Sequence, residues 1–151
     1  MTVPGDELQQ RNVVTAFLRH AGKILVVRRS GAVGTYQGRW SGISGYLETT
    51  PLEQALTEIR EETGLAGADV ELRAQGEPIF IDDPDLGVRW TVHPFLFEVH
   101  APEKIRLDWE NLEMRWIDPD ELSRLETVPA LAEAYRSCAR GGRAGSSRNI
   151  R

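Results

Sequence analysis

One helix in this sequence is marked at both ends, and it constrains the fold more than any other feature. Thr50 is a good N-cap, Pro51 suits the first helical position, and Glu53 completes a capping box with Thr50. Gly64 suits the left-handed conformation that commonly ends a helix. We therefore expect a helix over residues 50–64 with one buried stripe. The side chains of this stripe recur at intervals of three and four: Leu52, Ala55, Leu56, Ile59 and Thr63.

Three glutamates, Glu58, Glu61 and Glu62, fall on one arc of this helix beside the apolar stripe. Like charges at these spacings repel by roughly a few tenths of a kcal/mol per pair. One interpretation is a solvated acidic face, which tolerates such charges. The other is a divalent cation held between the carboxylates, which would remove the repulsion. Mg²⁺ and Mn²⁺ prefer oxygen ligands, so the second interpretation predicts a site for one of these two ions.

The rest of the hydrophobic pattern predicts a sheet packed against helices. A Gly-rich loop is expected over residues 30–38, a short helix after Asp118, and a last helix from about Pro129 to Ala139. Strands around a central helix and C-terminal helices make an α/β or α+β layered domain. The expected strands cover residues 12–18, 23–29, 40–47, 69–81, 88–99 and 112–117.

The length and the charge distribution indicate one domain followed by a basic tail. A chain of 151 residues suits a single domain, which we expect over residues 1–139. The net charge is −5, but residues 140–151 contribute +4, so the first 139 residues carry −9. An acidic body disfavours nucleic-acid binding, which requires basic side chains to neutralise phosphates. The Gly/Ser/Arg composition of residues 140–151 predicts a disordered tail.

The sequence favours a cytoplasmic protein with no membrane partner. No apolar run approaches the ~20 residues needed to span a bilayer, and the N-terminus has no signal-peptide pattern. Cys138 is the only cysteine, so an internal disulfide is excluded and a reducing compartment is favoured.

The acidic helix and the turn before it resemble the box that is characteristic of the Nudix family. Residues 58–65, EIREETGL, match the end of the pattern G-x5-E-x7-R-E-U-x-E-E-x-G-U, in which U is apolar. Residues 45–48 and 50–53 resemble the loop and the helix start of the same motif, and the resemblance covers roughly residues 12–137. It implies an α/β/α sandwich with a central mixed β-sheet. It also implies that water attacks a phosphoanhydride in a nucleoside diphosphate linked to a group X, with Mg²⁺ or Mn²⁺ as cofactor.

The resemblance also assigns roles to particular residues. Glu58, Glu61 and Glu62 would be the catalytic metal ligands, and Gly45 would lend its backbone carbonyl to the same site. One of these glutamates, or a glutamate from a later loop, would act as general base. The partner would be a small phosphorylated molecule, and dimers are common in the family, so a homodimer fits as well.

Further candidates lie outside the box. Glu110 and Glu113 fall in a predicted loop where some Nudix enzymes supply an additional base or metal ligand, although solvated loop acids are the alternative. Strand ends and the Gly-rich loop should face the site, so basic and aromatic side chains there are candidates for substrate binding. The alternatives for these are surface ion pairs and core packing. The candidates are Arg28, Arg29, Arg39 and Trp40, with Tyr36, Phe80 and Trp90 as further stacking residues.

The box departs from the family pattern at three positions. Thr57 stands where the pattern has its Arg, Thr49 where it has its first Glu, and Ile43 where it has its glycine, so that Gly45 lies two residues too close. In the family this Glu and Arg can brace each other and help to place the carboxylates. Our hypothesis is that the metal site persists without the brace, with slower chemistry or a higher metal requirement. The alternatives are a non-catalytic module that binds a nucleotide or sugar phosphate, and a partner-binding domain.

Overall fold

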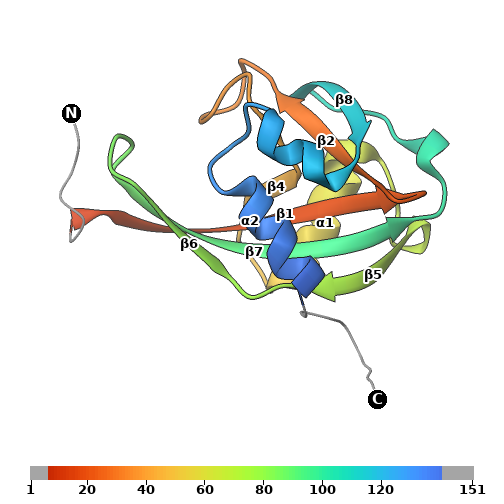
Figure 1. Cartoon of the computed structure of the whole chain (residues 1–151), viewed down its shortest axis with the longest axis horizontal. Coiled ribbons are helices and arrows are strands. Elements are labelled where there is room, and N and C mark those ends of the chain that lie inside the picture. The colour runs from red at the N-terminus through yellow and green to blue at the C-terminus, as the bar shows by residue number, and fades with distance from the viewer. Residues whose placement is uncertain (1–6, 141–151) are drawn as a thin grey trace.

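Two long parallel strands form the centre of the fold (Figure 1). The structure is a computed structural model that describes residues 7–140. Strand β1 (Gln9–His20) pairs with β7 (Val88–Val99) along almost its whole length. Both strands are rich in β-branched and aromatic residues, which favour extended backbone. The predicted hairpin after β1 is confirmed, because Arg19 and His20 pair with the start of the next strand.

The other strands extend this pair into a mixed sheet. β5 and β6 pair antiparallel with β7, β2 and β4 pair antiparallel with β1, and β3 and β8 pair antiparallel with β2. The sheet therefore has one parallel pair at its centre and antiparallel pairs around it. The bounds of these strands are β2 (Lys23–Arg29), β3 (Trp40–Ser41), β4 (Ile43–Tyr46), β5 (Val70–Gln75), β6 (Ile79–Asp83) and β8 (Asn111–Ile117).

The single strand expected over residues 69–81 is wrong, because the structure has two strands there, β5 and β6. The break includes Gly76, which lies against the C-terminal helix. A Cβ atom on Gly76 would lie 2.8 Å from the backbone nitrogen of Cys138. The missing side chain therefore allows the helix to approach the sheet at this point.

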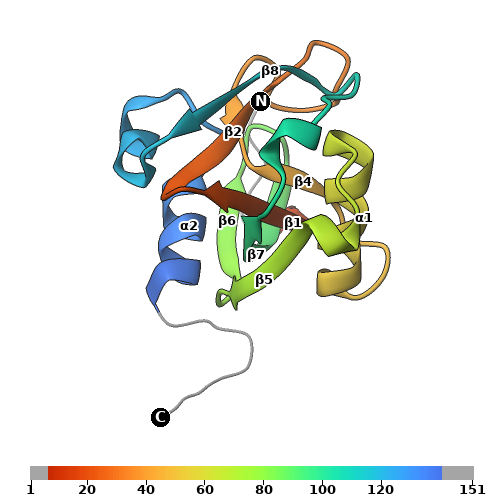
Figure 2. The ribbon, with the colours of Figure 1, turned by 90° about the vertical axis from the view of Figure 1, so that its right-hand side faces the viewer.

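Two α-helices cover opposite faces of the sheet, as Figure 2 shows. Helix α1 (Pro51–Thr63) begins after Thr50, whose side chain accepts a hydrogen bond from the Glu53 N–H, and ends at Gly64 with φ of 79°. The capping box is incomplete, since the Glu53 carboxylate instead accepts a 2.7 Å hydrogen bond from Thr49 Oγ1. Helix α2 (Leu131–Arg140) covers the other face. The predicted α/β/α sandwich is confirmed.

Short 3₁₀ helices complete the described part of the chain, at Gly67–Asp69, Pro102–Lys104 and Pro119–Arg124. None of the helices between residues 7 and 140 is long and apolar enough to cross a bilayer. The tail was predicted over residues 140–151. Arg140 is the last residue of α2, and residues 141–151 lie outside the described part of the chain.

Alternation along the central strands divides the core into two clusters, one under each helix. On β7, Phe95 and Phe97 pack on the side of α1, whereas Leu96 packs on the side of α2. Period-two alternation of this kind is expected for strands covered on both faces. The stripe predicted for α1 is only partly correct, because Leu52 is 37% exposed whereas Ala55 is fully buried.

Cys138 on α2 provides a direct test of this packing. Its side chain is buried, and burial raises the pKa of the thiol to about 12. At pH 8 the native thiol is therefore protonated and shielded, so we expect essentially no reaction with 5,5′-dithiobis(2-nitrobenzoic acid). The measurement is thiol release followed at 412 nm before and after addition of guanidinium chloride. Rapid labelling of the native protein would contradict the packing of α2.

Candidate active site

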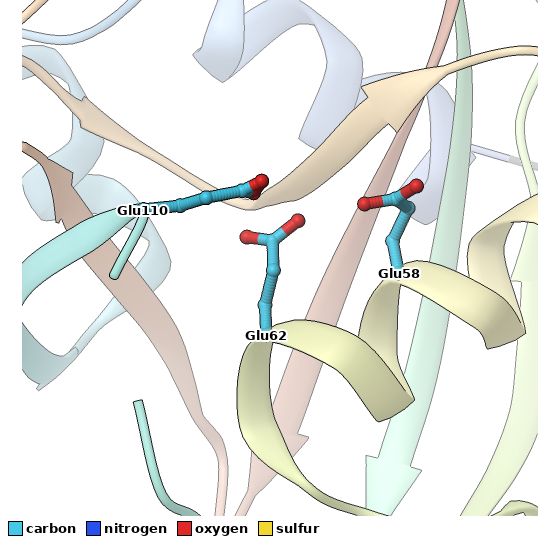
Figure 3. Close-up of side chains that lie close together, drawn as sticks. All are labelled: Glu58, Glu62 and Glu110. Carbon is cyan, nitrogen blue, oxygen red and sulfur yellow. The ribbon is translucent and has the colours of Figure 1, made fainter. Parts of the chain in front are cut away.

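Three carboxylates from two parts of the chain meet beside the sheet. Glu58 and Glu62 lie on the buried face of α1, four residues apart, and Glu110 lies in the loop that leads into β8. Each contributes a carboxylate oxygen, and these oxygens all lie within 4.8 Å of one another. Figure 3 shows the three side chains pointing toward a common space. We call these three residues the glutamate cluster.

Glu62 is the most strongly perturbed member of the glutamate cluster. Its Oε1 accepts a 3.0 Å hydrogen bond from Asn111 Nδ2, whereas its Oε2 is buried and accepts no hydrogen bond from residues 7–140, which the structure describes. Burial, followed by the charge of Glu110, raises the pKa of Glu62 to about 10. A buried carboxylate oxygen that lacks a donor is strongly unfavourable, so this position favours a proton or a cation.

Burial is also the main cause of the shifts at the other two members. It raises the pKa of Glu58, against the effect of the hydrogen bond from Gln54, and it raises the pKa of Glu110, with the charge of Asp108 adding to it. The glutamate cluster thus places three acidic groups close together with little solvent around them. Simultaneous ionisation of all three carboxyl groups is therefore unfavourable.

Gly45 on β4 lies directly against the glutamate cluster. A Cβ atom at this position would lie 2.6 Å from Glu58 Oε1, so any side chain here would require the Glu58 carboxylate to move. The absence of a side chain therefore allows the strand backbone to approach the Glu58 carboxylate. The family resemblance implies that the Gly45 carbonyl is a metal ligand, and the closeness of Gly45 to Glu58 is compatible with that role.

The structure separates the third predicted glutamate of the helix from the other two. Glu61 is exposed and is not a member of the glutamate cluster. Its charge nevertheless contributes to raising the pKa of both Glu58 and Glu110, so it lies on the open side of the same site.

The two predicted substrate arginines at the end of β2 have different environments. Arg28 forms an ion pair with Glu113, its register partner on the neighbouring strand β8, with 2.8 Å between Nη2 and Oε1. The structure therefore does not bring Arg28 or Glu113 to the glutamate cluster. Arg29 lies near it, and burial lowers the pKa of Arg29 while the charges of Glu62 and Glu110 oppose that shift. Arg29 Nε donates a 2.9 Å hydrogen bond to the carbonyl oxygen of Thr35, which fixes the guanidinium.

Arg39 and Trp40 are occupied elsewhere. Trp40 is buried in the α2-side core, and the Arg115 guanidinium carbon lies 4.6 Å from the centre of its ring. Arg39 donates a 3.4 Å hydrogen bond to the carbonyl oxygen of Thr127 and approaches the ring of Tyr36. Neither residue lines the cavity described next.

A cavity of about 300 Å³ opens beside the glutamate cluster and includes Gly45 and Glu110 in its wall. Arg29 also lines it, so the cavity carries one cationic and one acidic side chain. Two of the predicted stacking residues, Tyr36 and Trp90, are in its wall. The remaining wall is mostly aromatic and aliphatic, with Val13, Tyr46, Ile81, Val92, Trp109, Val128, Leu131 and Ala134.

The polar side-chain atoms of Trp90 and Tyr36, two aromatic residues of the cavity wall, are paired with each other and with Asp83. Trp90 Nε1 donates a 3.0 Å hydrogen bond to the Tyr36 hydroxyl, and that hydroxyl donates to Asp83 Oδ2. Burial and this bond to Asp83 raise the pKa of Tyr36 to about 12, so it remains a neutral donor. Phe80, the other predicted stacking residue, is 71% exposed and does not line the cavity.

The sequence interpretation missed two neighbours of the glutamate cluster. Gln54 donates from Nε2 to Glu58 Oε2 at 2.8 Å, and Asn111 donates to Glu62. A signal was present for both, since Gln54 precedes Glu58 by one helical turn and Asn111 directly follows Glu110. Tyr46 and Trp109 were also missed, although each adjoins a predicted site residue in the sequence.

The donor set fits a hard divalent cation. All three members of the glutamate cluster offer carboxylate oxygens, and Glu62 Oε2 lacks a partner in the described part of the chain. Carboxylate oxygens without nitrogen or sulfur donors favour Mg²⁺ or Mn²⁺ over Zn²⁺ or Cu²⁺. The glutamate cluster can therefore hold such a cation beside the cavity.

Comparison with known structures finds the same fold in several proteins. The MutT protein from Methanosarcina mazei Go1 superposes with a TM-score of 0.73 at 22% identity, covering 89% of this chain and 96% of that chain. The dihydroneopterin triphosphate pyrophosphohydrolase from E. coli gives 0.71 at 15% identity, covering 86% and 96%. The NUDIX domain of Shewanella oneidensis NrtR, complexed with ADP ribose, gives 0.66 at 14% identity, covering 89% and 91%.

At these identities the likeness to solved structures concerns the fold alone. Membership rests on the sequence pattern of the family, described as NUDIX domain, which matches residues 8–138. That span includes β1, the α1 box, the glutamate cluster and most of α2. The chain belongs to the NUDIX domain family.

Proposed function

We propose that this protein is a Mg²⁺- or Mn²⁺-dependent hydrolase of a phosphoanhydride in a nucleoside diphosphate linked to X, or in a related small substrate. The observation that carries the proposal is the glutamate cluster beside an aromatic cavity, with Glu62 Oε2 lacking a donor among the described residues. Such a cluster has little structural value without a cation, because its carboxylates repel and are poorly solvated.

In the proposed mechanism Glu58 and Glu62 would hold the cation from α1, and Gly45 would supply a backbone oxygen. Glu61, which is exposed, would complete the ligand set, as the family resemblance implies. A cation bound there would offset the charge of the phosphates and lower the pKa of the attacking water. Each of these protein groups is fixed by a helix or a strand, which favours precise positioning.

Glu110 is our candidate for the general base. It is a member of the glutamate cluster, it lines the cavity, and burial raises its pKa. A carboxylate with a raised pKa is a better proton acceptor near neutral pH. Arg29, on the same cavity wall, would pair with a phosphate oxygen and orient the substrate. Arg28, Arg39 and Trp40 are not part of this proposal.

The cavity indicates the class of substrate. Tyr36, Tyr46, Trp90 and Trp109 provide ring faces and edges, so an uncharged aromatic ring system attached to the phosphates would fit. Two proteins of the same fold are a dihydroneopterin triphosphate pyrophosphohydrolase and a NUDIX domain complexed with ADP ribose, and each of these molecules joins a heteroaromatic ring to linked phosphates. We therefore propose a heteroaromatic di- or triphosphate derivative as the substrate.

A substrate screen tests the proposal. ADP ribose, nucleoside triphosphates and other ring-linked phosphoanhydrides are incubated with Mg²⁺ or Mn²⁺, and product release is followed by chromatography. We expect metal-dependent turnover of at least one compound and none in the presence of EDTA. Saturable binding without turnover would favour the binding-module alternative, for which Thr49 and Thr57 in place of the box Glu and Arg are the motivating observation. Absence of both would overturn the proposal.

Cellular context follows from the same features. A small phosphorylated substrate and a lone buried cysteine suit the cytoplasm, and the acidic body makes a nucleic-acid partner unfavourable. A homodimer remains part of the proposal from the family resemblance.

A further inference from the structure

Gln54 connects the loop before α1 to the glutamate cluster. The side chain is 3% exposed and lies on the buried face of α1, one turn before Glu58. Its Oε1 accepts a 2.9 Å hydrogen bond from the backbone N–H of Glu48, and its Nε2 donates a 2.8 Å hydrogen bond to Glu58 Oε2. One amide thus ties the backbone of the loop to a carboxylate of the site.

The orientation of this amide is determined by its partners. The Glu48 N–H can only donate, so it requires the amide oxygen, and the NH₂ group must then face the Glu58 carboxylate. A hydrogen bond to a carboxylate is stronger than one between neutral groups and holds its rotamer more firmly. Gly45 on β4 also approaches this carboxylate, since a Cβ atom there would lie 2.6 Å from Glu58 Oε1. Glu58 therefore accepts from an amide donor and lies against a strand backbone.

A purely structural role explains Gln54 less well. The start of α1 already has a cap in Thr50, whose side chain accepts from the Glu53 N–H, and Pro51 at its first position. An aliphatic residue would fill a buried helix position without requiring two hydrogen bonds. The polar side chain at this position is best explained by the carboxylate that it contacts.

The sequence departures point the same way. In the box pattern a Glu and an Arg stand at the positions of Thr49 and Thr57, and this chain lacks both. Thr49 Oγ1 bonds to the Glu53 carboxylate, on the exposed side of the helix start. Among the described residues, it is Gln54, in the first turn of α1, that donates a hydrogen bond to Glu58.

We propose that Gln54 is a positioning residue that fixes the Glu58 carboxylate for cation binding and replaces the brace absent at Thr49 and Thr57. The inference rests on the proposed function, because it takes the glutamate cluster as a divalent-cation site. Gln54 acts on the substrate only through Glu58.

Mn²⁺ binding by the full-length protein, measured by electron paramagnetic resonance, tests this role without substrate. Gln54→Met keeps the side-chain length and removes both hydrogen bonds, and Gln54→Ala is measured beside it in case methionine disturbs the packing. We expect each to weaken Mn²⁺ binding by about tenfold or more, as is usual when an outer partner of a metal ligand is lost. The matched control is Thr50→Ala, which weakens the start of α1 without changing any contact of Glu58.

The comparison with Thr50→Ala separates positioning from helix stability. If Thr50→Ala lowers the melting temperature as much as the Gln54 variants but keeps wild-type Mn²⁺ affinity, the positioning role is supported. Unchanged Mn²⁺ affinity in a folded Gln54 variant would overturn this inference alone. Failure of the wild-type protein to bind Mn²⁺ would overturn the cation site and, with it, both proposals.

A rescue experiment tests the replacement of the brace. Thr49→Glu and Thr57→Arg are introduced together into the Gln54→Met variant, which rebuilds the family pattern at those positions. Recovery of most of the lost Mn²⁺ affinity would support the equivalence of the two devices. No recovery in a folded triple variant would overturn that equivalence.

Discussion

Glu62→Gln should abolish turnover and, in the absence of metal, make the protein more stable. The amide can keep the hydrogen bond from Asn111 through its oxygen and place its NH₂ group where Glu62 Oε2 now lacks a partner, facing acceptors on Glu58 and Glu110. It cannot supply a charged ligand, so we expect a loss of roughly 10³-fold or more in kcat with any substrate that the screen identifies.

The stability gain follows from the raised pKa of Glu62. A carboxyl group with a folded-state pKa near 10 and an unfolded value of 4.5 binds one more proton in the folded state between those two values. The stability of the metal-free protein therefore falls as pH rises through that window. At pH 7 the loss amounts to about 3 kcal/mol relative to pH 4.5, and Glu62→Gln removes it.

Thermal unfolding in EDTA at pH 6 and pH 8 measures both effects. From pH 6 to pH 8 the melting temperature of the wild-type protein should fall by more than the melting temperature of Glu62→Gln. Added Mn²⁺ should strongly raise the melting temperature of the wild-type protein only. Glu103→Gln, at an exposed position outside the glutamate cluster, is the control and should behave as wild type. A Glu62→Gln protein that is less stable than wild type in EDTA would contradict the buried, unpartnered state of this carboxyl group.

Glu61 offers a graded comparison for the same experiment. Its side chain is exposed, so Glu61→Gln should change the metal-free melting temperature little. If Glu61 is a cation ligand, the kcat of Glu61→Gln should also fall. The loss should be about ten times smaller than the loss in Glu62→Gln, because water can replace an exposed ligand.

Gly45→Ala should disrupt the cation site through a single methyl group. The added Cβ would lie 2.6 Å from Glu58 Oε1, so the carboxylate must move away from the strand and leave its present place in the glutamate cluster. A displacement of about 1 Å at a catalytic group commonly costs about 10²-fold in rate. We expect at least that loss in kcat and a clear weakening of Mn²⁺ binding, measured by electron paramagnetic resonance.

Gly67→Ala is the matched control for this substitution. Gly67 has no heavy atom within 4 Å of its Cβ position and does not have a positive φ, so alanine fits there without strain. It should preserve Mn²⁺ affinity and turnover. Wild-type Mn²⁺ affinity in Gly45→Ala would show that Glu58 has room to move without loss, which would contradict the close approach of β4.

The sequence was sufficient to predict the elements with strong local signals. Thr50, Pro51 and Gly64 mark the ends of α1 independently of the rest of the fold, and the spacing of Glu58 and Glu62 places both on one side of that helix. The box pattern then supplied the sandwich architecture, because the family match extends over most of the chain.

Contacts between distant segments were beyond such reasoning. Arg28 and Arg29 are adjacent, and no local signal reveals that Arg28 pairs with Glu113 on β8 while Arg29 faces the cavity, with an irregularity in register between them. Side-chain direction at the end of a strand depends on register, and one residue of shift reverses it. Gln54 was overlooked for a related reason, since its partner Glu48 belongs to a loop whose path the pattern does not specify.

The parallel pairing of β1 with β7 also determines at which stage of its synthesis this chain can fold. Arg19 on β1 contacts Glu98 on β7, a separation of 79 residues, and α1 with its glutamates lies in the chain between these strands. Contacts of such high sequence separation raise the contact order and slow folding. A nascent chain that has left the ribosome only as far as α1 carries the box glutamates without the central strand pair or Glu110. The proposed metal binding would therefore be a late event, coupled to completion of the sheet rather than to formation of the helix.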